Sequence, residues 1–358
     1  MEYKIYNLVH FHPNGRMAEK FVRPLIDKEI ELGHKSTLIC DDKKSNPNSK
    51  QIKFKINYLN FFYILFNLIY IIKILKLNKT SHVLVHNSST AIIPLLASRI
   101  VGIKNIIYFN HGVPYIGYNG FLKVVLFILE KLNCILAKKI VTVSKDMKKT
   151  LSIITKNNIN IIHNGSASGI NLDKFSKKIY VHSKLIQKLK INKKNFVITY
   201  IGRTEDRKGF NFLIDLWEKK LQDKNFTVLI CGSDKVDYED TNLKFLGFVN
   251  NIPEILSITN CLILPSKHEG LPYAILESLA IGCPVVASNI PGISSLIKNN
   301  KNGLLVDNFN HDDYLDKIMK IRSNKVFTRN IVKNGLKISE KYCRKKFLEH
   351  YIKFLSSK

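Results

Sequence analysis

Short apolar runs rich in β-branched residues recur along this chain and alternate with longer segments of helical periodicity. In the first half of the chain, the runs lie at residues 4–11, 36–40, 82–86, 106–111, 140–144 and 159–163. In the second half, they lie at residues 196–202, 227–232, 243–248, 261–266, 284–288 and 303–307. Near-continuous apolar strands that alternate with helices indicate parallel sheets with helices on both faces. Two such series predict an α/β protein with two doubly wound, Rossmann-like domains.

The boundary between the two domains is expected in the polar, lysine-rich segment 174–195, which separates the two series of runs. A length of 358 residues is comfortable for two domains and long for one. We therefore predict one domain over residues 1–180 and a second over residues 181–338. Residues 339–358 combine apolar spacing with a basic face, which predicts a C-terminal helix.

The chain carries a formal net charge of +28 at pH 7. Residues 1–180 hold 27 basic and 10 acidic side chains, against 29 and 18 in residues 181–358, so the excess is spread over the chain and is denser in its first half. Such a charge favours anionic partners, which include lipid headgroups, diphosphates and nucleic acid. Only the net charge supports a nucleic-acid partner. The sequence contains no helix-turn-helix and no basic motif interleaved with aromatic residues. We therefore expect no nucleic acid as a partner.

The six cysteines are scattered and include no C-x-x-C pair, which is typical of buried or free thiols in a reducing compartment. Residues 1–11 (MEYKIYNLVHF) place an acid beside the first base and contain only a short apolar run. We interpret this segment as a first strand and not as a signal peptide. Both observations predict a cytoplasmic protein.

Residues 58–77 (YLNFFYILFNLIYIIKILKL) form the most apolar segment, with no charge before Lys73. The uncharged part is shorter than a spanning helix requires. A buried helix that covers a sheet is one interpretation, and a helix lying in the plane of lipid headgroups, with lysines at its end, is another. A membrane span is the third and the least favoured.

A basic turn, GRTEDRKG at residues 202–209, directly follows the run FVITYI and precedes a helical pattern at residues 210–220. A strand, a glycine and the start of a helix place backbone N–H groups where an anion can bind. Arg203 and Lys208 add a planar guanidinium and a point charge. Fixed cations of this kind stabilise the charge that develops on a departing nucleoside diphosphate. The alternative is a solvated basic turn, which the combination of strand, glycines and helix disfavours.

Two carboxylates stand eight positions apart in PSKHEGLPYAILESLA, residues 265–280. Glu269 lies in the loop after a predicted strand, and Glu277 lies in the first turns of the next helix. Gly270 and Pro272 shape the loop and start that helix. A carboxylate accepts several hydrogen bonds and so suits the neighbouring hydroxyls of a sugar. Glu277 could instead serve only the helix dipole, which would leave the loop motif unexplained.

Residues 196–307 resemble the nucleotide-binding domain of the GT-B retaining glycosyltransferases of family 4, also described as glycosyl transferases group 1. The resemblance is carried, in order, by G-R-x-x-x-x-K-G at 202–209, E-G-L-P-x-x-x-x-E at 269–277, G-C-P-V-V-A at 282–287 and N-G-L-L-V at 302–306. It extends more loosely to the first half through NHG at 110–112, VS at 143–144 and HNG at 163–165. The resemblance implies two domains that face each other across a cleft. In this fold the last helix often crosses back to the first domain, although 339–358 could also be a surface helix of the second.

The resemblance also implies roles for single residues. Arg203 and Lys208 would hold the donor diphosphate. Glu277 would bind the ribose hydroxyls, and Glu269 would bind the hydroxyls of the transferred sugar. His111 would reach the donor sugar from the first domain, although a histidine at a strand end could also simply cap the sheet.

Further donor contacts follow from the same resemblance. The backbone around Gly270, Leu271 and Pro272 would approach the sugar and the phosphate. Phe248 and Val249 would line the base pocket, with uracil as the base most frequent in the family.

Two loops depart from the family's usual pattern. The loop after the first strand usually carries a pair of glycines near the diphosphate, whereas HPNGR at residues 12–16 has only Gly15. Gly15 can still permit close approach of the backbone to the donor, and Arg16 could supplement it. Ser295 stands where relatives usually have glutamate, so this loop could serve helix capping or donor contact.

Members of the family usually act without a metal, and the sequence agrees, because no D-x-D stands at a strand end. The acidic cluster at residues 237–240 is better explained as a solvated loop. We expect no metal and no cofactor. The matched motifs offer no carboxylate that we would assign as a covalent nucleophile. The resemblance implies front-face transfer in which the leaving diphosphate takes the acceptor proton.

The sequence therefore predicts a retaining hexosyl- or N-acetylhexosaminyltransferase of envelope or surface polysaccharide synthesis. The predicted partners are a nucleotide-sugar donor, a glycan or lipid-linked acceptor, and the anionic inner face of the cell membrane. A sugar-nucleotide epimerase of the same fold is the enzymatic alternative. A non-catalytic glycan-binding scaffold is the alternative from another class, and a diphosphate clamp argues against it.

Overall fold

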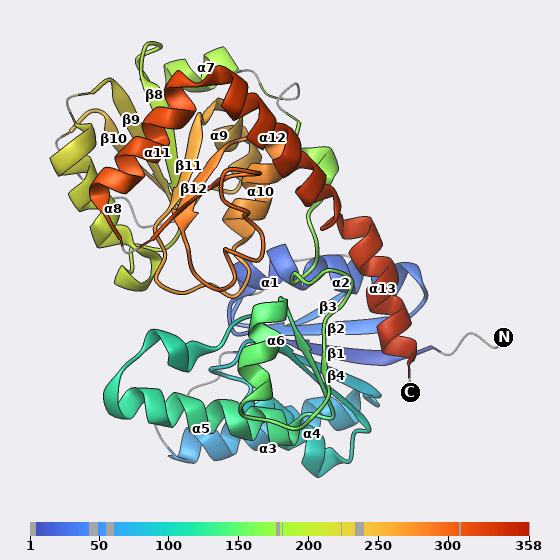
Figure 1. The fold of residues 1–358 in the computed structure, drawn as a ribbon. Coiled ribbons are helices and arrows are strands. Elements are labelled where there is room, and N and C mark those ends of the chain that lie inside the picture. The colour runs from blue at the N-terminus through green and yellow to red at the C-terminus, as the bar shows by residue number, and fades with distance from the viewer. Residues whose placement is uncertain are drawn as a thin grey trace. The chain divides into compact units, whose positions relative to one another are not determined.

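A computed structural model of the chain describes residues 5–42, 49–54, 61–176, 180, 182–222, 224–232, 240–307 and 309–357. These residues form two compact units (Figure 1). Unit 1 comprises Met1–Gly169 and Lys345–Lys358, and unit 2 comprises Ile170–Arg344. Each unit is built around one parallel sheet.

The sheet of unit 1 has the strand order β3-β2-β1-β4-β5-β6-β7 among the described residues. Its strands are β1 (Asn7–Phe11), β2 (Lys35–Cys40), β3 (Lys50–Lys53), β4 (His82–His86), β5 (Asn105–Asn110), β6 (Lys139–Thr142) and β7 (Ile159–Asn160). All six runs predicted for the first half are strands. The edge strand β3 was not predicted, because its sequence KQIK contains one apolar residue.

The sheet of unit 2 has the order β10-β9-β8-β11-β12-β13 among the described residues. Its strands are β8 (Phe196–Ile201), β9 (Phe226–Cys231), β10 (Leu243–Gly247), β11 (Cys261–Leu264), β12 (Val285–Ser288) and β13 (Leu304–Val306). They correspond to the six runs predicted for the second half. Both units thus have the Rossmann strand order, in which the first strand lies between the second and the fourth.

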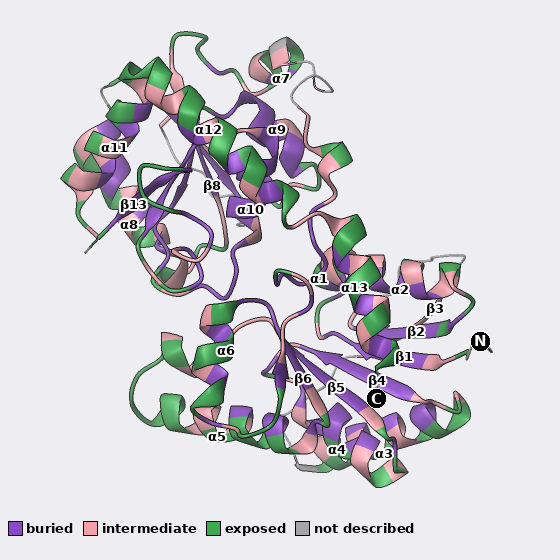
Figure 2. Cartoon of the chain, turned by 45° about the vertical axis from the view of Figure 1, so that its right-hand side comes forward, coloured by how far each residue is buried: buried purple, intermediate pink, exposed green. Residues whose placement is uncertain are grey.

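Helices cover both faces of each sheet, and buried residues concentrate in the strands between them (Figure 2). In unit 1 they are α1 (Gly15–Phe21), α2 (Arg23–Glu31), α3 (Phe61–Leu77), α4 (Ile92–Val101), α5 (Gly120–Leu136), α6 (Lys145–Ser152) and α13 (Arg344–Ser356). In unit 2 they are α7 (His182–Lys188), α8 (Phe210–Leu216), α9 (Ile252–Ile258), α10 (Tyr273–Ile281), α11 (His311–Ser323) and α12 (Lys325–Glu340). The chain continues from α8 through a π-helical turn, Trp217–Leu221.

The two faces of the unit 1 sheet have different coverings. Alternate residues of each strand point to the same face, so Leu8, Leu84 and Phe109 form one apolar row. Helices α2 and α13 pack on this row, with Phe347, Tyr351 and Leu355 of α13 all buried against it. Helices α3, α4 and α5 lie on the other face (Figure 1).

The last helix begins at Arg344 and not at residue 339, which corrects the start that we predicted. Residues 341–343 form a turn after α12, because Ile170 interrupts the helix by pairing with this segment. The Ile170 N–H donates to the Tyr342 carbonyl at 2.8 Å, and the Arg344 N–H donates to the Ile170 carbonyl at 2.8 Å. Apolar spacing in the sequence does not reveal this partner, which is distant along the chain.

Helix α3 buries one side and exposes apolar residues on the other. Ile71, Ile74 and Leu75 are buried, whereas Phe62 and Phe66 are 76% and 60% exposed. Residues 58–60 of the apolar segment lie outside the described residues. Within the described part of the chain, every helix is too short or too polar to cross a membrane.

The packing of α13 on unit 1 predicts a stability effect. Replacing the buried Phe347 by Ala (Phe347→Ala) should lower the free energy of unfolding by about 3–5 kcal/mol, because it leaves a cavity in the apolar row. Urea denaturation measures the change. The exposed Glu349 of the same helix provides the control, since Glu349→Ala should change stability by less than about 0.5 kcal/mol. Equal stability of Phe347→Ala and wild type would contradict the packing.

Candidate functional site

The loops after β8 and β11 lie next to each other because these two strands pair in parallel, with Ile263 opposite Tyr200. The first loop carries the basic turn, and the second carries Glu269. Gly209 makes the close approach possible. Its φ is +72°, and a Cβ atom at this position would lie 1.7 Å from the Pro265 carbonyl oxygen. Any larger residue at position 209 would therefore push the two loops apart.

Tyr200 holds the basic turn in place through its hydroxyl group. Its buried hydroxyl donates to the Arg203 carbonyl at 2.8 Å and lies 3.3 Å from the Lys208 carbonyl oxygen. One side chain thus contacts both ends of the turn. This tyrosine could not be singled out from the sequence, because it reads as one apolar position of a buried strand. A 3₁₀ turn, Asp206–Lys208, completes the loop before α8.

Lys208 and Glu269 form an ion pair between the two loops. The Lys208 Nζ lies 2.7 Å and 2.8 Å from the two Glu269 carboxylate oxygens. The Ser266 hydroxyl donates to Glu269 Oε1 at 2.7 Å and holds the carboxylate in place. Glu269 is only 5% exposed, so this pair is largely removed from water. The structure therefore brings together two of the residues predicted from separate motifs.

Arg203 occupies a more open position. Its guanidinium contacts Glu205 at 2.6 Å, and its side chain is 61% exposed. Arg207, which was not among the predicted site residues, lies 3.7 Å from the same Glu205 and is less exposed. Burial lowers the pKa of the neighbouring His268, with Arg207 and Lys208 lowering it further against the opposing effect of Glu269. His268 is thus neutral at pH 7 beside a cluster of basic groups.

The segment from Gly270 to Glu277 forms a buried loop and the start of α10. Leu271 is 8% exposed, Pro272 is the N-cap residue of α10, and Glu277 is 5% exposed in this helix. The following loop packs directly on this backbone, because a Cβ atom at Gly292 would lie 2.4 Å from the Glu269 carbonyl oxygen. The Ser295 hydroxyl donates to the Gly292 carbonyl at 2.9 Å, so it stabilises that turn.

Phe248 and Val249 follow the edge strand β10, which is separated from β8 by β9. Phe248 is 49% exposed, and Val249 is half-buried. The Gly232 N–H donates to the Gly247 carbonyl at 2.8 Å and joins the loops after β9 and β10. Residues 237–239 of the acidic cluster lie outside the described residues.

In unit 1, Gly15 begins α1 and is buried. Its N–H donates to the Asp41 carboxylate at 2.6 Å, and a Cβ atom at Gly15 would lie 2.4 Å from the Asp42 Cβ. A carboxylate therefore already binds the N–H of Gly15, the residue at which we expected close approach of the backbone to the donor. A contact between Gly15 and the donor stays a prediction.

His111 directly follows β5 and belongs to a cluster of histidines on the α2–α13 face of the sheet. Its Nε2 lies 3.3 Å from His86 Nδ1, and its ring lies edge-on to that of His12, 6.5 Å between centroids. Burial lowers the pKa of His111 to about 3 and that of His12 to about 4. Burial also places the pKa of His86 well below its usual value. These three rings are therefore neutral at pH 7.

The loop around His111 is held from the opposite face of the sheet. The Asn110 Nδ2 donates to Glu130 Oε1 at 2.8 Å and to the Gly112 carbonyl at 3.0 Å. The Tyr108 hydroxyl also lies 2.8 Å from Glu130 Oε1. Burial raises the pKa of Glu130 to about 7, although these hydrogen bonds oppose the increase. Sequence analysis singled out neither Glu130 nor Tyr108.

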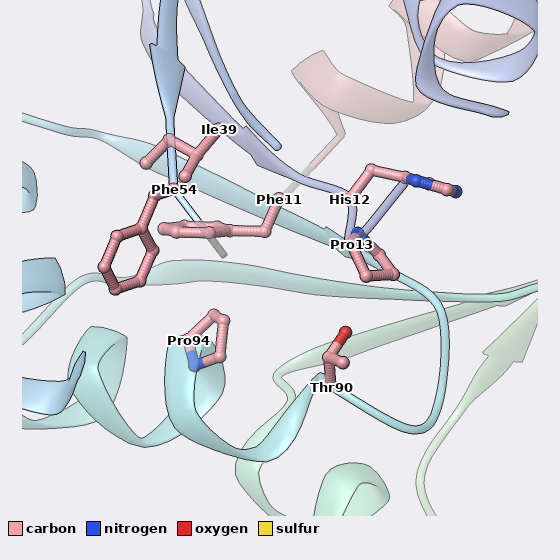
Figure 3. A pocket seen from close by; sticks show the side chains of 7 residues that line it. All are labelled: Phe11, His12, Pro13, Ile39, Phe54, Thr90 and Pro94. Carbon is pink, nitrogen blue, oxygen red and sulfur yellow. The ribbon is translucent and has the colours of Figure 1, made fainter. Parts of the chain in front are cut away.

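A small hollow lies beside His12 at the carboxyl end of β1 (Figure 3). Phe11, Phe54 and Pro94 line its apolar side, and the imidazole of His12 points away from them. A wider hollow of about 480 Å³ lies at the amino ends of β1 and β2 and contains no predicted site residue. The described residues contain no cluster of three or more His, Cys, Asp or Glu side chains that could hold a metal ion.

Two family models match the chain. The model described as Glycosyl transferases group 1 matches residues 181–338, and the model described as Glycosyltransferase Family 4 matches residues 18–166. The first range lies in unit 2, and the second lies in unit 1. Together they span most of the sequence.

Two bacterial enzymes illustrate the relatives. The chain is 27% identical over 305 residues to the UDP-Gal:alpha-D-GlcNAc-diphosphoundecaprenol alpha-1,3-galactosyltransferase of Escherichia coli, which covers 80% of this chain and 75% of that protein. It is 28% identical over 321 residues to the N,N'-diacetylbacillosaminyl-diphospho-undecaprenol alpha-1,3-N-acetylgalactosaminyltransferase of Campylobacter jejuni, which covers 82% of each.

Solved structures share the fold. HepE of Anabaena, in complex with UDP and glucose, has a TM-score of 0.82 at 16% identity and covers 99% of this chain and 100% of that one. A glycosyltransferase from Rickettsia africae has a TM-score of 0.79 at 21% identity, with the same coverage. Likenesses at these identities concern the fold alone. They confirm the predicted GT-B class of two Rossmann-like domains.

The buried neutral histidines predict a pH dependence of stability. His12, His86 and His111 have lower pKa values when folded than when unfolded, so the unfolded chain binds more protons as pH falls below about 6.5. Their contribution to stability is present above pH 6.5 and is lost towards pH 4. Glu130 opposes this, because its raised pKa makes the folded state take up a proton between pH 7 and 4.5. We expect the three histidines to dominate.

The contribution of a single histidine can be measured with His12→Gln. Urea denaturation of wild type at pH 7 and pH 5 gives the loss of stability, and the variant should lose about 2 kcal/mol less. The variant His350→Gln, at an exposed position, should behave as wild type. An identical loss in wild type and His12→Gln would show that His12 does not titrate as a buried group.

Proposed function

Because the chain belongs to the group 1, family 4 glycosyltransferases, we propose that it transfers a sugar from a nucleoside diphosphate, UDP in our preferred case, to a glycan or lipid-linked acceptor with retention of configuration. The observation that carries this proposal is the Lys208–Glu269 pair between the adjacent loops after β8 and β11. A diphosphate and a sugar are joined in the donor, and the pair offers one group suited to each.

In the proposed reaction, the bond between the anomeric carbon and the diphosphate oxygen breaks, and its electron pair stays on the diphosphate. The acceptor oxygen bonds to the same face of the anomeric carbon and passes its proton to the diphosphate. Lys208 and Arg203 stabilise the charge that develops on the leaving group. A lysine with three N–H donors can exchange one contact to Glu269 for a phosphate oxygen.

Glu269 serves the transferred sugar in this proposal. Its carboxylate offers about four acceptor positions, of which Lys208 and Ser266 occupy some. The remaining positions accept hydroxyl hydrogens of the sugar. The Ser266 contact and the low exposure of Glu269 support a fixed orientation, which selects for hydroxyls at one spacing.

The other donor contacts follow the same proposal. Glu277 binds the ribose hydroxyls, and the backbone at Gly270–Pro272 approaches the sugar and the phosphate. Phe248 and Val249 contact the base, and His111 contacts the transferred sugar. The half-exposed ring of Phe248 supports a stacking contact with a base.

A surface on helices α3, α4 and α5 supports contact with the membrane. We name these helices' exposed apolar residues the α3–α5 surface: Phe62, Tyr63, Leu65, Phe66, Ile69, Leu77, Leu96, Ile100, Phe121, Leu122, Val124, Ile128, Leu132 and Ile135. The three helices lie side by side on one face of unit 1, with exposed residues along their outer sides (Figure 2). Scattered exposed apolar residues are ordinary, but so many of them on three adjacent helices are not.

Exposed lysines lie among these apolar residues, with Lys73 and Lys76 in α3 and Lys123 and Lys131 in α5. Apolar side chains beside lysines suit the boundary between acyl chains and anionic headgroups. We propose that α3 both packs on the sheet and contacts lipid, which combines two of the interpretations of residues 58–77. A lipid-linked acceptor fits such a location, and the Escherichia coli and Campylobacter jejuni relatives are named for diphosphoundecaprenol acceptors.

The role of the diphosphate clamp can be tested by substitution. Lys208→Ala should lower kcat/KM for release of nucleoside diphosphate from a nucleotide sugar by about 100-fold or more, because a fixed cation at the leaving group is lost. Glu277→Ala should raise the KM for the donor. Lys220 pairs with Asp312 on the surface of the same unit and provides the control, Lys220→Ala, with wild-type turnover. Full turnover in Lys208→Ala would remove the site assignment.

The α3–α5 surface can be tested by co-sedimentation with vesicles. The double variant Phe66→Glu, Phe121→Glu should bind phosphatidylglycerol vesicles at least about tenfold more weakly than wild type, because each change removes an apolar side chain and adds a negative charge. The double variant Met319→Glu, Val326→Glu makes the same change at exposed apolar residues of unit 2 and should bind as wild type. Equal losses in both double variants would indicate an effect of net charge alone and would overturn the assignment.

A further inference from the structure

A continuous chain of hydrogen-bonding groups connects His111 to a buried carboxylate. His111 Nε2 lies 3.3 Å from His86 Nδ1, and His86 Nε2 lies 3.2 Å from His10 Nδ1. His10 Nε2 lies 3.1 Å and 3.0 Å from the two oxygens of Glu29. His10, His86 and Glu29 are all at most 1% exposed. We call these four residues the histidine chain.

The sheet explains why the three rings line up. His10 is the residue before the end of β1, His86 ends β4, and His111 follows β5. These three strands are neighbours in the sheet. The rings continue the apolar row of Leu8, Leu84 and Phe109 on the α2–α13 face. Adjacent rings are stacked, with 5.5 Å between the centroids of His10 and His86 and 5.5 Å between those of His86 and His111.

The far end of the histidine chain is held by two further donors. The Ser36 hydroxyl donates to Glu29 Oε2 at 2.5 Å, and the Tyr351 hydroxyl of α13 donates to Glu29 Oε1. Burial alone would raise the pKa of Glu29, but the contact with His10 and the hydrogen bonds from Ser36 and Tyr351 hold that pKa below its usual value. Glu29 is therefore a carboxylate at neutral pH, and it can only accept hydrogen bonds.

A neutral imidazole has one N–H donor and one acceptor nitrogen, so each contact in the histidine chain fixes the next. Glu29 requires the proton of His10 on Nε2, which makes His10 Nδ1 an acceptor when that ring is neutral. His86 must then donate from Nε2, and its Nδ1 must accept. His111 must donate from Nε2. With a neutral His10, the polarity of every bond runs towards Glu29, and the Nδ1 of His111 keeps a lone pair. A protonated His10 would reverse the polarity and place the proton of His111 on Nδ1.

We propose that Glu29, His10 and His86 are positioning residues that keep the proton of His111 on Nε2, so that His111 Nδ1 accepts a hydrogen bond from a hydroxyl of the transferred sugar. The inference rests on the proposed function for the identity of that hydroxyl. The inference takes His10 as a neutral ring that donates from Nε2 to Glu29. The lowered pKa values of His86 and His111 agree with neutral rings at those two positions.

Other groups around the histidine chain leave its polarity unchanged. His12 faces His86 and His111, at 6.4 Å and 6.5 Å between ring centroids, and its Nδ1 accepts the N–H of Asn14. Burial lowers the pKa of His12 and that of His34. The charge of Asp41 opposes this effect at His12, and the charge of Glu29 opposes it at His34. The ring of Phe21 in α1 packs 6.3 Å from that of His111.

A chain of apolar side chains would fill the same space without the cost of burying a carboxylate and three imidazoles. Apolar residues of the same strands, Leu8, Leu84 and Phe109, already pack on this face. The position of the polar groups, in one line that ends at the carboxyl edge of the sheet, is therefore better explained by a role at His111 than by packing.

The test reads the tautomer of His111 directly. NMR of the full-length protein labelled with 15N-histidine, with the His111 signals assigned by the loss in His111→Gln, distinguishes a protonated Nε2 from a protonated Nδ1. Wild type should show the Nε2–H form. In Glu29→Gln, the amide N–H can donate to His10 and so reverse the direction of the hydrogen bonds along the histidine chain. His86→Phe removes the hydrogen bonds made at position 86 but keeps an aromatic ring against Phe109. Glu29→Gln should populate the Nδ1–H form of His111. His86→Phe removes the acceptor of the His111 Nε2–H and should leave a mixture of the two forms.

The control is Glu130→Gln, which changes the other buried carboxylate of unit 1 and should keep the Nε2–H form. In turnover, Glu29→Gln should lower kcat by about tenfold or more, while the dissociation constant for the nucleoside diphosphate stays within about twofold. An Nδ1–H form in wild type, or an unchanged Nε2–H form in both Glu29→Gln and His86→Phe, would overturn the inference. Absence of any turnover by wild type would instead refute the proposed function, because the tautomer is measured without substrate.

Discussion

The parallel pairing of β8 with β11 is the constraint on which the candidate donor site depends. It places two loops from distant parts of the sequence at one edge of the sheet, and Gly209 permits the contact between them. The Lys208–Glu269 pair then joins the loops at 2.7 Å. An ion pair of low exposure is seldom a large gain in stability, because desolvation offsets the attraction. In the proposed function, a ligand replaces one contact of each partner, which gives the pair a role other than stability.

Among its described residues, unit 1 buries two carboxylates, Glu29 and Glu130, and their surroundings decide their charge. Glu29 faces His10, Ser36 and Tyr351, and its pKa is lowered. Glu130 receives hydrogen bonds from Tyr108 and Asn110, but burial outweighs them and raises its pKa to about 7. Glu29 anchors the histidine chain that ends at His111. Glu130 holds the loop around His111 through Asn110. The two faces of one sheet thus support the same loop with carboxylates of different protonation.

The strands were predictable because a buried parallel strand leaves an uninterrupted apolar run, and all twelve predicted runs are strands. The same rule failed for β3, whose polar residues lie at an exposed edge. Lys208 and Glu269 could be proposed from motifs, since each stands in a recognisable local pattern. Tyr200, Glu29, His10 and His86 could not, because their partners are remote in sequence and local periodicity counts them as positions in a strand or helix. The break before α13 has the same cause.

A structure of the chain with a bound nucleotide sugar tests the central claim most directly. The account predicts diphosphate oxygens within about 3 Å of Lys208 Nζ and a hydroxyl of the sugar at the Glu269 carboxylate. A nucleotide sugar bound elsewhere, with the Lys208–Glu269 pair unchanged and without contact to the donor, would contradict it.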